Sequence, residues 1–162
     1  MPHEGLDRFV EAQSHQTSGF DAALLELRTG GKRGHWIWYI FPQLSGLGAS
    51  WMAQHYEIRG VDEATSYLTH PVLGPRLLEL TRIVREQVRQ GANVRDLMGS
   101  RIDALKLVSS LTLFRGVASR VAADHECAVC VELAVAAGEV LATAELQGYP
   151  PCQFTLAALE RT

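Results

Sequence analysis

Residues 103–121, DALKLVSSLTLFRGVASRV, decide the fold class of this chain. Apolar side chains recur along them at helical spacing, at Ala104, Leu107, Leu111, Phe114, Ala118 and Val121. Further leucines and valines occupy positions between these, so the segment predicts a helix that is buried nearly all round. No pair of strand-like segments with turn residues between them appears in the chain. We therefore predict a mainly α fold.

The composition is that of one compact domain. Of the 162 residues, 47% are hydrophobic and 20% are charged, which excludes wholesale disorder. No stretch rich in Pro, Gly and Ser is long enough to separate two domains, so we predict a single globular domain over residues 1–162. Hydrophobic periodicity indicates about six to eight helices, one of which begins with Ser18 and Asp21 as a capping pair.

Charge and cysteine content point to a cytoplasmic protein. The net charge of −3 gives no general attraction to nucleic acid or to an anionic membrane, so neither is an expected partner. Residues 1–9 lack the basic flank and apolar core of a signal peptide. Glu132 and Glu139 interrupt the most apolar stretch, residues 127–144, which argues against a membrane span. Three cysteines without an export signal favour reduced thiols.

The densest aromatic run is WIWYIF at residues 36–41. Its continuous apolar character fits either a short buried strand or a short core helix, and periodicity does not decide between them. Pro42 ends the run in both cases, because the residue before a proline is pushed toward an extended conformation.

A glycine-rich basic loop, GGKRG at residues 30–34, precedes this run. Its glycines would let successive backbone N–H groups converge on one point, which is how an anion-binding nest forms. Lys32 and Arg33 would then engage phosphate, while Trp36, Trp38 or Tyr39 would stack on a flat ring. The alternative is that the loop is a solvated connector and the aromatic side chains belong to the core.

Lys106 stands on the predicted central helix, with no other charged residue before Arg115. A lysine on such an apolar helix either reaches out to water or is held by a partner, and Asp103, one turn earlier, is the nearest candidate. The alternative makes Asp103 the helix N-cap, leaves Lys106 at the surface, and bonds the hydroxyl groups that follow to carbonyls one turn back.

His125, Cys127, Cys130 and Cys152 could in principle supply four zinc ligands. The surroundings of the CxxC read as a continuous core helix rather than the tight turn that zinc ligands favour. We therefore expect the cysteines to pack as small hydrophobic side chains, and we assign neither a metal nor a cofactor.

Three longer motifs, in order, resemble a known family. They are HWIWYIFPQLSGLG from residue 35, EATSYLTHPVLGPRL from residue 63 and DALKLVSSLTLF from residue 103. Together they are similar to the mostly bacterial DUF1810 family of unknown function, whose members carry HWMWFIFPQ, HPVLGPRL and KLxSSMTLF. The resemblance implies a single, chiefly helical cytoplasmic domain and no particular reaction. A remoter likeness is to the NADAR group, which is associated with NAD and ADP-ribose chemistry.

These observations lead to one hypothesis and one alternative. The hypothesis is a pocket for a nucleotide or an ADP-ribose-type ligand, with a hydrolytic N-glycosidic cleavage as its reaction. His35, Lys106 and Asp103 would carry the chemistry, with His35 as the acid–base group. The ligand-binding residues would be Lys32, Arg33, Trp36, Trp38, Gln43 and Ser109. The alternative is a non-catalytic protein-interaction domain whose aromatic run is core.

Overall fold

The computed structural model describes residues 5–162, and these form ten helices and no strand. The helices are α1 (Asp7–Gln13), α2 (Phe20–Arg28), α3 (Ile37–Ile40), α4 (Trp51–His55), α5 (Val61–Thr69), α6 (Leu73–Arg89), α7 (Val94–Met98), α8 (Arg101–Asp124), α9 (Ala128–Leu146) and α10 (Gln153–Glu160). The predicted mainly α domain is confirmed. The helices outnumber the expected six to eight because α3, α4 and α7 have only four or five residues each, too few to show a periodicity.

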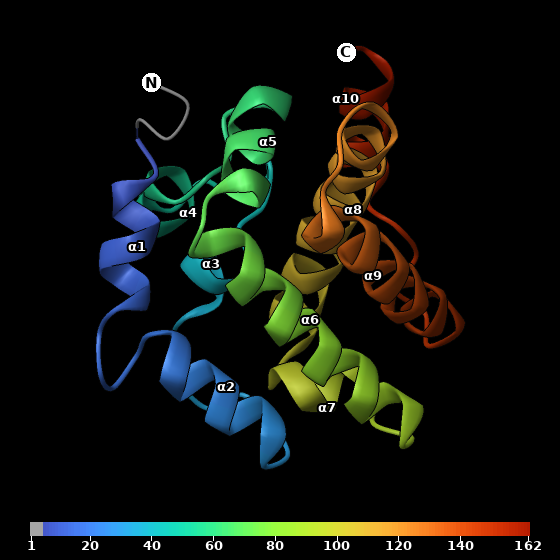
Figure 1. The fold of residues 1–162 in the computed structure, drawn as a ribbon. Helices are drawn as coiled ribbons and strands as arrows, with labels where there is room; N and C mark the ends of the chain where they lie inside the picture. The colour runs from blue at the N-terminus through green and yellow to red at the C-terminus, as the bar shows by residue number, and fades with distance from the viewer. Residues whose placement is uncertain (1–4) are drawn as a thin grey trace.

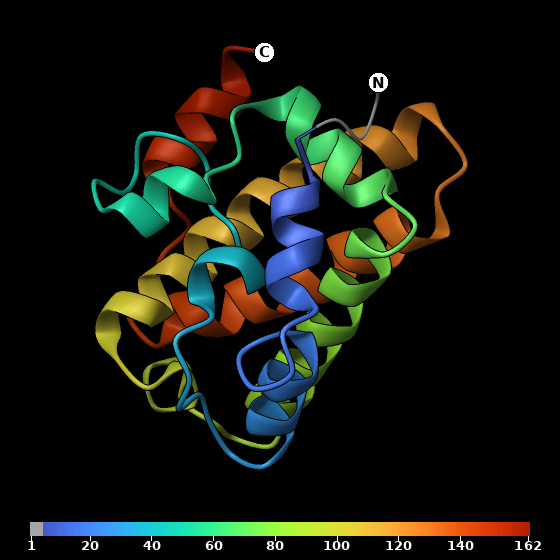
Figure 2. The same cartoon turned by 90° about the vertical axis from the view of Figure 1, so that its left-hand side faces the viewer.

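α8, the helix predicted from residues 103–121, is the centre of the packing. It lies beside α9, which it contacts most extensively, and it also contacts α3, α5, α7 and α10. Figure 1 shows α1 to α5 on one side of the molecule and α8 to α10 on the other, with α6 running between them; Figure 2 shows the same arrangement after a quarter turn. Every residue from Leu107 to Phe114 is buried, so the prediction of a helix covered nearly all round is confirmed.

Two predicted helix starts are wrong by one to three residues. Ser100, not Asp103, caps α8, and its hydroxyl oxygen accepts a hydrogen bond from the Asp103 backbone N–H at 3.1 Å. Gly19, not Ser18, precedes α2. A Cβ at position 19 would lie 2.3 Å from two backbone carbonyl oxygens, so the tight approach of the chain requires glycine at this point and moves the helix start past Ser18.

The aromatic run is helical, so of the two alternatives left open for residues 36–41 the short core helix is the one that forms, and no strand does. α3 forms one turn, in which the backbone N–H of Phe41 donates to the carbonyl of Ile37 at 3.1 Å. The run is buried at Trp36, Ile37, Tyr39, Ile40 and Phe41, and Trp38 alone is half-buried. Pro42 follows directly, and the helix stops there as predicted.

Two glutamates of α9, Glu132 and Glu139, join it to α6. Arg89 donates to both carboxylate oxygens of Glu139, at 2.8 and 2.9 Å, and Arg82 contacts Glu132. These pairs are largely exposed, which limits the contribution of each to stability to roughly 0.2–1 kcal/mol. No helix within residues 5–162 has the length and apolarity needed to cross a lipid bilayer.

The expectation of reduced, separately packed cysteines is wrong for two of the three. Cys127 and Cys130 form a disulfide, while Cys152 is a free thiol. α9 begins only at Ala128, so Cys127 is its N-cap and Cys130 lies in its first turn. Their Cα atoms are 5.3 Å apart, within the range that a disulfide bridges.

Candidate functional site

The glycine-rich loop forms the predicted nest, but a carboxylate of the chain itself occupies it. Glu26, on α2, accepts hydrogen bonds from the backbone N–H groups of Arg33 and Gly34, the latter at 2.6 Å. The indole N–H of Trp36 donates to the same oxygen at 3.3 Å. The backbone N–H groups that were expected to hold phosphate are therefore occupied by a carboxylate of the chain itself.

Glu26 is held in its ionised form. Burial raises the pKa of this carboxyl, but the hydrogen bonds from Gly34, Arg33 and Trp36, together with the charge of Lys32, outweigh it, and the net pKa lies below the ordinary value. A fixed negative charge in the nest repels a second anion. This charge weighs against the phosphate-binding role that the sequence suggested for Lys32 and Arg33.

Lys32 is engaged by the central helix. Its Nζ lies 2.8 Å from Asp103 Oδ2, and the side chains of the two residues are only 7% and 18% exposed. The same ammonium donates to the Gly34 carbonyl at 2.5 Å and lies 5.1 Å from the centre of the Trp36 ring. Asp103, the nearest candidate partner for Lys106 in the sequence, pairs with Lys32 instead and so fastens the loop to α8.

Lys106 has an aromatic partner instead. Its Nζ lies 5.1 Å from the centre of the Trp38 ring, a cation–π contact. Within residues 5–162, no carboxylate forms an ion pair with this ammonium. Trp38 is half-buried, and its indole N–H is buried without a hydrogen-bond partner. The segments around residues 36 and 106 therefore do meet, through Trp38 and Lys106 and through Lys32 and Asp103.

The Lys106 pocket, about 480 Å³ in volume, opens beside this contact. It lies between α8, the start of α4 and the loop that joins α3 to α4. Its lining consists of Gln43, Leu47, Gly48, Ala49, Ser50, Ala53, Ile102, Leu105, Lys106 and Ser109. A narrow cleft of about 10 Å³, lined among others by Trp38, Gln43 and Lys106, adjoins it. Four of the predicted site residues thus come together: Trp38, Gln43, Lys106 and Ser109.

The other predicted residues do not share this pocket. Trp36 is completely buried in the core, so the expectation that it stacks on a ligand is wrong. Arg33 and His35 are exposed, and neither is among the residues that line the pocket. The imidazole at position 35 and the ammonium at position 106 therefore do not enclose one hollow, as the catalytic hypothesis required.

Sequence reasoning missed Cys152 as a neighbour of the site. It is the N-cap of α10, and the hydroxyl group of Thr155 donates to its sulfur at 3.2 Å. Burial raises the pKa of the Cys152 thiol, but hydrogen bonds from Thr155, Ser109 and the backbone N–H groups that follow outweigh it and lower the pKa. The spacing of Cys152 and Thr155 at a helix start was the available signal. The contact with Ser109, which is 43 positions away along the chain, had no signal in the sequence.

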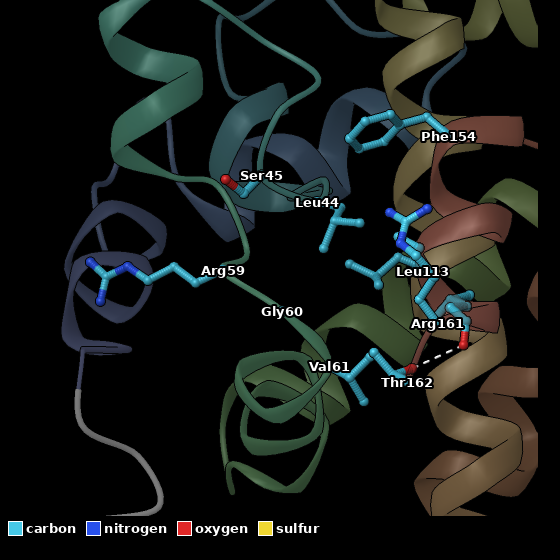
Figure 3. A pocket seen from close by; sticks show the side chains of 11 residues that line it. Leu44, Ser45, Arg59, Gly60, Val61, Leu113, Phe154, Arg161 and Thr162 are labelled. Carbon is cyan, nitrogen blue, oxygen red and sulfur yellow. Dashed lines mark hydrogen bonds between the residues drawn. The ribbon is translucent and has the colours of Figure 1, made fainter.

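A second pocket, about 370 Å³ in volume, lies on the side of the molecule that holds α10 (Figure 3). Its apolar lining includes Leu44, Leu113 and Phe154. Figure 3 shows the Arg59 side chain extending away from this pocket toward α1, which leaves Arg161 as the cation that faces it. None of the predicted site residues lines this pocket.

The comparisons with known proteins give a family and a fold. A family model described as "Protein of unknown function (DUF1810)" matches residues 3–131. A search of curated proteins found no match. Among solved structures, the crystal structure of the conserved hypothetical protein Rv1873 from Mycobacterium tuberculosis is 36% identical, with 97% of each chain covered and a TM-score of 0.72. Neither description states an activity.

Proposed function

Because the chain belongs to the DUF1810 family, described only as proteins of unknown function, we propose from its geometry that it binds a small anionic ligand of the nucleotide or ADP-ribose class in the Lys106 pocket. The observation that carries this proposal is the ammonium of Lys106, which borders the pocket without an ion-pair partner among residues 5–162. A partly desolvated cation of this kind attracts an anion more strongly than a fully hydrated one does.

The rest of the lining supplies what such a ligand needs. Ser50 accepts a hydrogen bond from the Ala53 backbone N–H at 3.1 Å, which leaves its O–H free to donate to a ligand oxygen. The amide of Gln43 adds donors and an acceptor beside Lys106. Leu47 and Ile102 form an apolar wall for the body of the ligand. The volume lies within the range of ordinary small-molecule sites, roughly 300–1,000 Å³.

The geometry supports binding rather than N-glycosidic hydrolysis. Hydrolysis needs an acid–base group within hydrogen-bond reach of the scissile bond. The residues that line the Lys106 pocket include neither a carboxylate nor an imidazole. His35 is exposed elsewhere, and Asp103 is committed to Lys32. The Lys106 pocket therefore has no group placed for the hydrolytic step.

Titration with ADP-ribose and with AMP, followed by tryptophan fluorescence, tests the proposal. Trp38 reports on binding because its ring lies under the Lys106 ammonium. Lys106→Gln should weaken binding about ten-fold or more, the usual effect of losing a charge-assisted hydrogen bond. Arg101→Gln removes one charge from an exposed position of the same helix and should leave the affinity unchanged. If the wild-type protein gives no saturable response at millimolar ligand, the proposal is wrong.

Exposed apolar side chains near the pocket favour a protein-interaction domain as the second candidate. Trp51 is 69% exposed and Ile102 is 64% exposed, and α4 and α8, which carry them, both contribute to the pocket wall. Under this alternative, a partner's side chain fills the Lys106 pocket. Trp51→Ser should then abolish a complex of defined stoichiometry without changing the response to nucleotides.

A further inference from the structure

The disulfide between Cys127 and Cys130 lies at the start of a long helix, beside a pocket that plays no part in the proposed function. Cys127 is the N-cap of the nineteen-residue helix α9 and is half-buried, whereas Cys130 is completely buried. The Cys127 sulfur also accepts a hydrogen bond from the Cys130 backbone N–H at 3.2 Å. The two sulfur atoms therefore differ in access and in hydrogen bonding.

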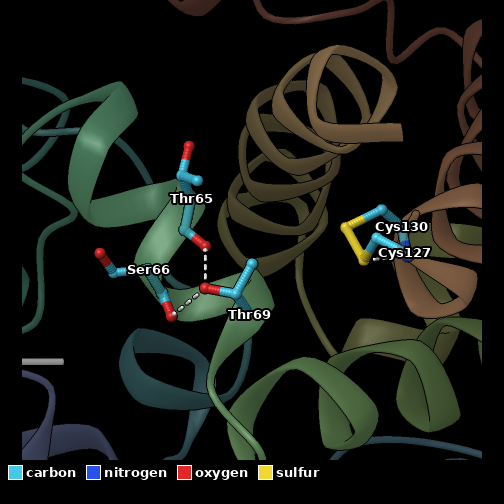
Figure 4. The surroundings of a disulfide bond; sticks show 5 residues. All are labelled: Thr65, Ser66, Thr69, Cys127 and Cys130. Carbon is cyan, nitrogen blue, oxygen red and sulfur yellow. Dashed lines mark hydrogen bonds between the residues drawn. A yellow bond between two sulfur atoms is a disulfide. The ribbon is translucent and has the colours of Figure 1, made fainter. Parts of the chain in front are cut away.

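A pocket of about 500 Å³ adjoins Cys127. One wall comes from the end of α5 and the turn into α6, with Thr69 and Pro71, and the other from the turn between α8 and α9. Figure 4 shows both sulfur atoms on the side of α9 that faces Thr65 and Thr69. Of the two cysteines, Cys127 lines the pocket and Cys130 does not. A reagent that enters from solvent therefore meets Cys127 first.

Helix geometry favours the Cys127 sulfur as the reactive one. Once the disulfide is reduced, this sulfur stays at a helix N-terminus, where unpaired N–H groups and the helix dipole stabilise a negative charge. The thiolate is the nucleophile in disulfide exchange, and a cysteine in a CxxC at a helix start is more readily ionised than a free one. Cys130, three residues on, is buried directly behind it and placed to close the disulfide again.

We propose that Cys127 and Cys130 form a thiol–disulfide exchange site that reacts with a low-molecular-weight disulfide bound in this pocket. In the oxidising direction, the Cys127 thiolate attacks one sulfur of the substrate disulfide. The substrate S–S bond breaks, and one thiolate leaves with the electron pair and takes a proton from water. Cys130 then loses its proton and attacks the Cys127 sulfur, which releases the second substrate thiolate. Two protein thiols are oxidised and one disulfide is reduced to two thiols.

The experiment uses glutathione disulfide as the probe and Cys152→Ser as the background, so that the third thiol does not contribute. Each variant is reduced, freed of reductant, mixed with glutathione disulfide and quenched with N-ethylmaleimide before its intact mass is measured. With both cysteines present, the protein should regain its internal disulfide and carry no adduct. Cys130→Ser should instead accumulate one glutathionyl group on Cys127. Cys127→Ser should keep the Cys130 thiol largely unmodified. Its adduct should form at least about ten-fold more slowly than the adduct on Cys127 in the Cys130→Ser variant, because Cys130 is buried.

The same reactions in denaturant control for folding, because both single-cysteine variants should then react at similar rates. Far-ultraviolet circular dichroism checks that each variant is folded under native conditions. Equal rates for the two folded variants would overturn the proposal. So would a folded protein whose two thiols stay reduced in excess glutathione disulfide, since the exchange site would then be inert.

Discussion

The ion pair between Lys32 and Asp103 should respond very differently to the loss of each partner. Asp103→Asn leaves the Lys32 ammonium, whose side chain is only 7% exposed, with a carbonyl and an aromatic ring as its partners. Lys32→Met leaves the Asp103 carboxylate, which is 18% exposed and lies in the first turn of α8. The positive end of the helix dipole stabilises that carboxylate even without Lys32. Removing the acid should therefore be the more damaging change.

The size of each effect follows from the burial of the group left behind. Breaking a fully buried pair costs about 3–5 kcal/mol of unfolding free energy. For Asp103→Asn the group left behind is the Lys32 ammonium, which keeps the Gly34 carbonyl and the Trp36 ring as weaker partners, so the cost should be roughly 2–4 kcal/mol. Lys32→Met should cost about 1–2 kcal/mol, because a helix N-terminus contributes up to about 2 kcal/mol to a partly buried anion. The double variant should be less destabilised than the sum of the two, with a coupling energy of about 1–3 kcal/mol.

Urea unfolding of the wild type, the two single variants and the double variant measures these quantities. Asp96→Asn, on the exposed side of α7, is the matched control and should change stability by less than about 0.5 kcal/mol. Equal losses for Lys32→Met and Asp103→Asn would show that the helix dipole does not protect Asp103. Strictly additive losses would show that the two side chains do not interact, and the account of how the loop is held to α8 would fail.

Three further predictions concern the loop, a tight turn and the free thiol. The pKa of Glu26 is lowered from 4.5, so the contribution of its ionised form to stability is complete above pH 4.5 and is lost as the pH falls through the folded-state pKa. Glu26→Gln should therefore lower the unfolding free energy at neutral pH. Unfolding curves measured at decreasing pH should show the difference from wild type becoming smaller. Gly99→Ala should destabilise more than Gly91→Ala in thermal unfolding, since both have positive φ but only the Cβ at 99 meets a carbonyl oxygen, at 3.0 Å; equal losses would contradict the close approach. Thr155→Val removes a hydrogen bond that lowers the pKa of Cys152, so the pH profile of iodoacetamide alkylation should move to higher pH, and an unmoved profile would show that this bond is not formed.

Long-range apolar periodicity carried most of the fold prediction. The segment at 103–121 shows its burial in the sequence because each turn of a long helix repeats the same environment. α3 has a single turn, which is too short to show a periodicity. The sequence alone therefore could not distinguish a helix from a strand at this position. The start of α2 was misplaced for a different reason. Its position depends on the close approach of Gly19 to the backbone carbonyls of residues 13 and 15, which local capping preferences do not register.

The candidate site was half predictable, because chemistry-bearing residues can be recognised along the chain whereas their partners in space cannot. The glycines of the loop correctly indicated converging N–H groups, but the anion they bind is Glu26, on the helix before them. A carboxylate that close in sequence was visible, yet only the bend of the chain at the end of α2 brings it back to the loop. The motif therefore predicted the nest correctly, but it did not reveal that Glu26 is the anion bound there.

The proposed function depends on which of two lysines, Lys32 or Lys106, forms the ion pair with Asp103. Sequence proximity assigned Asp103 to Lys106, one turn away on the same helix, and left Lys32 to meet a ligand. The fold makes the opposite choice, since Asp103 pairs with Lys32 at 2.8 Å and Lys106 is left against the Trp38 ring. By pairing with Lys32, the Asp103 carboxylate neutralises that ammonium and leaves Lys106 as the cation that can bind an anionic ligand. If the Asp103→Asn variant gained affinity for anions at Lys32 without losing it at Lys106, this division of roles would be directly visible.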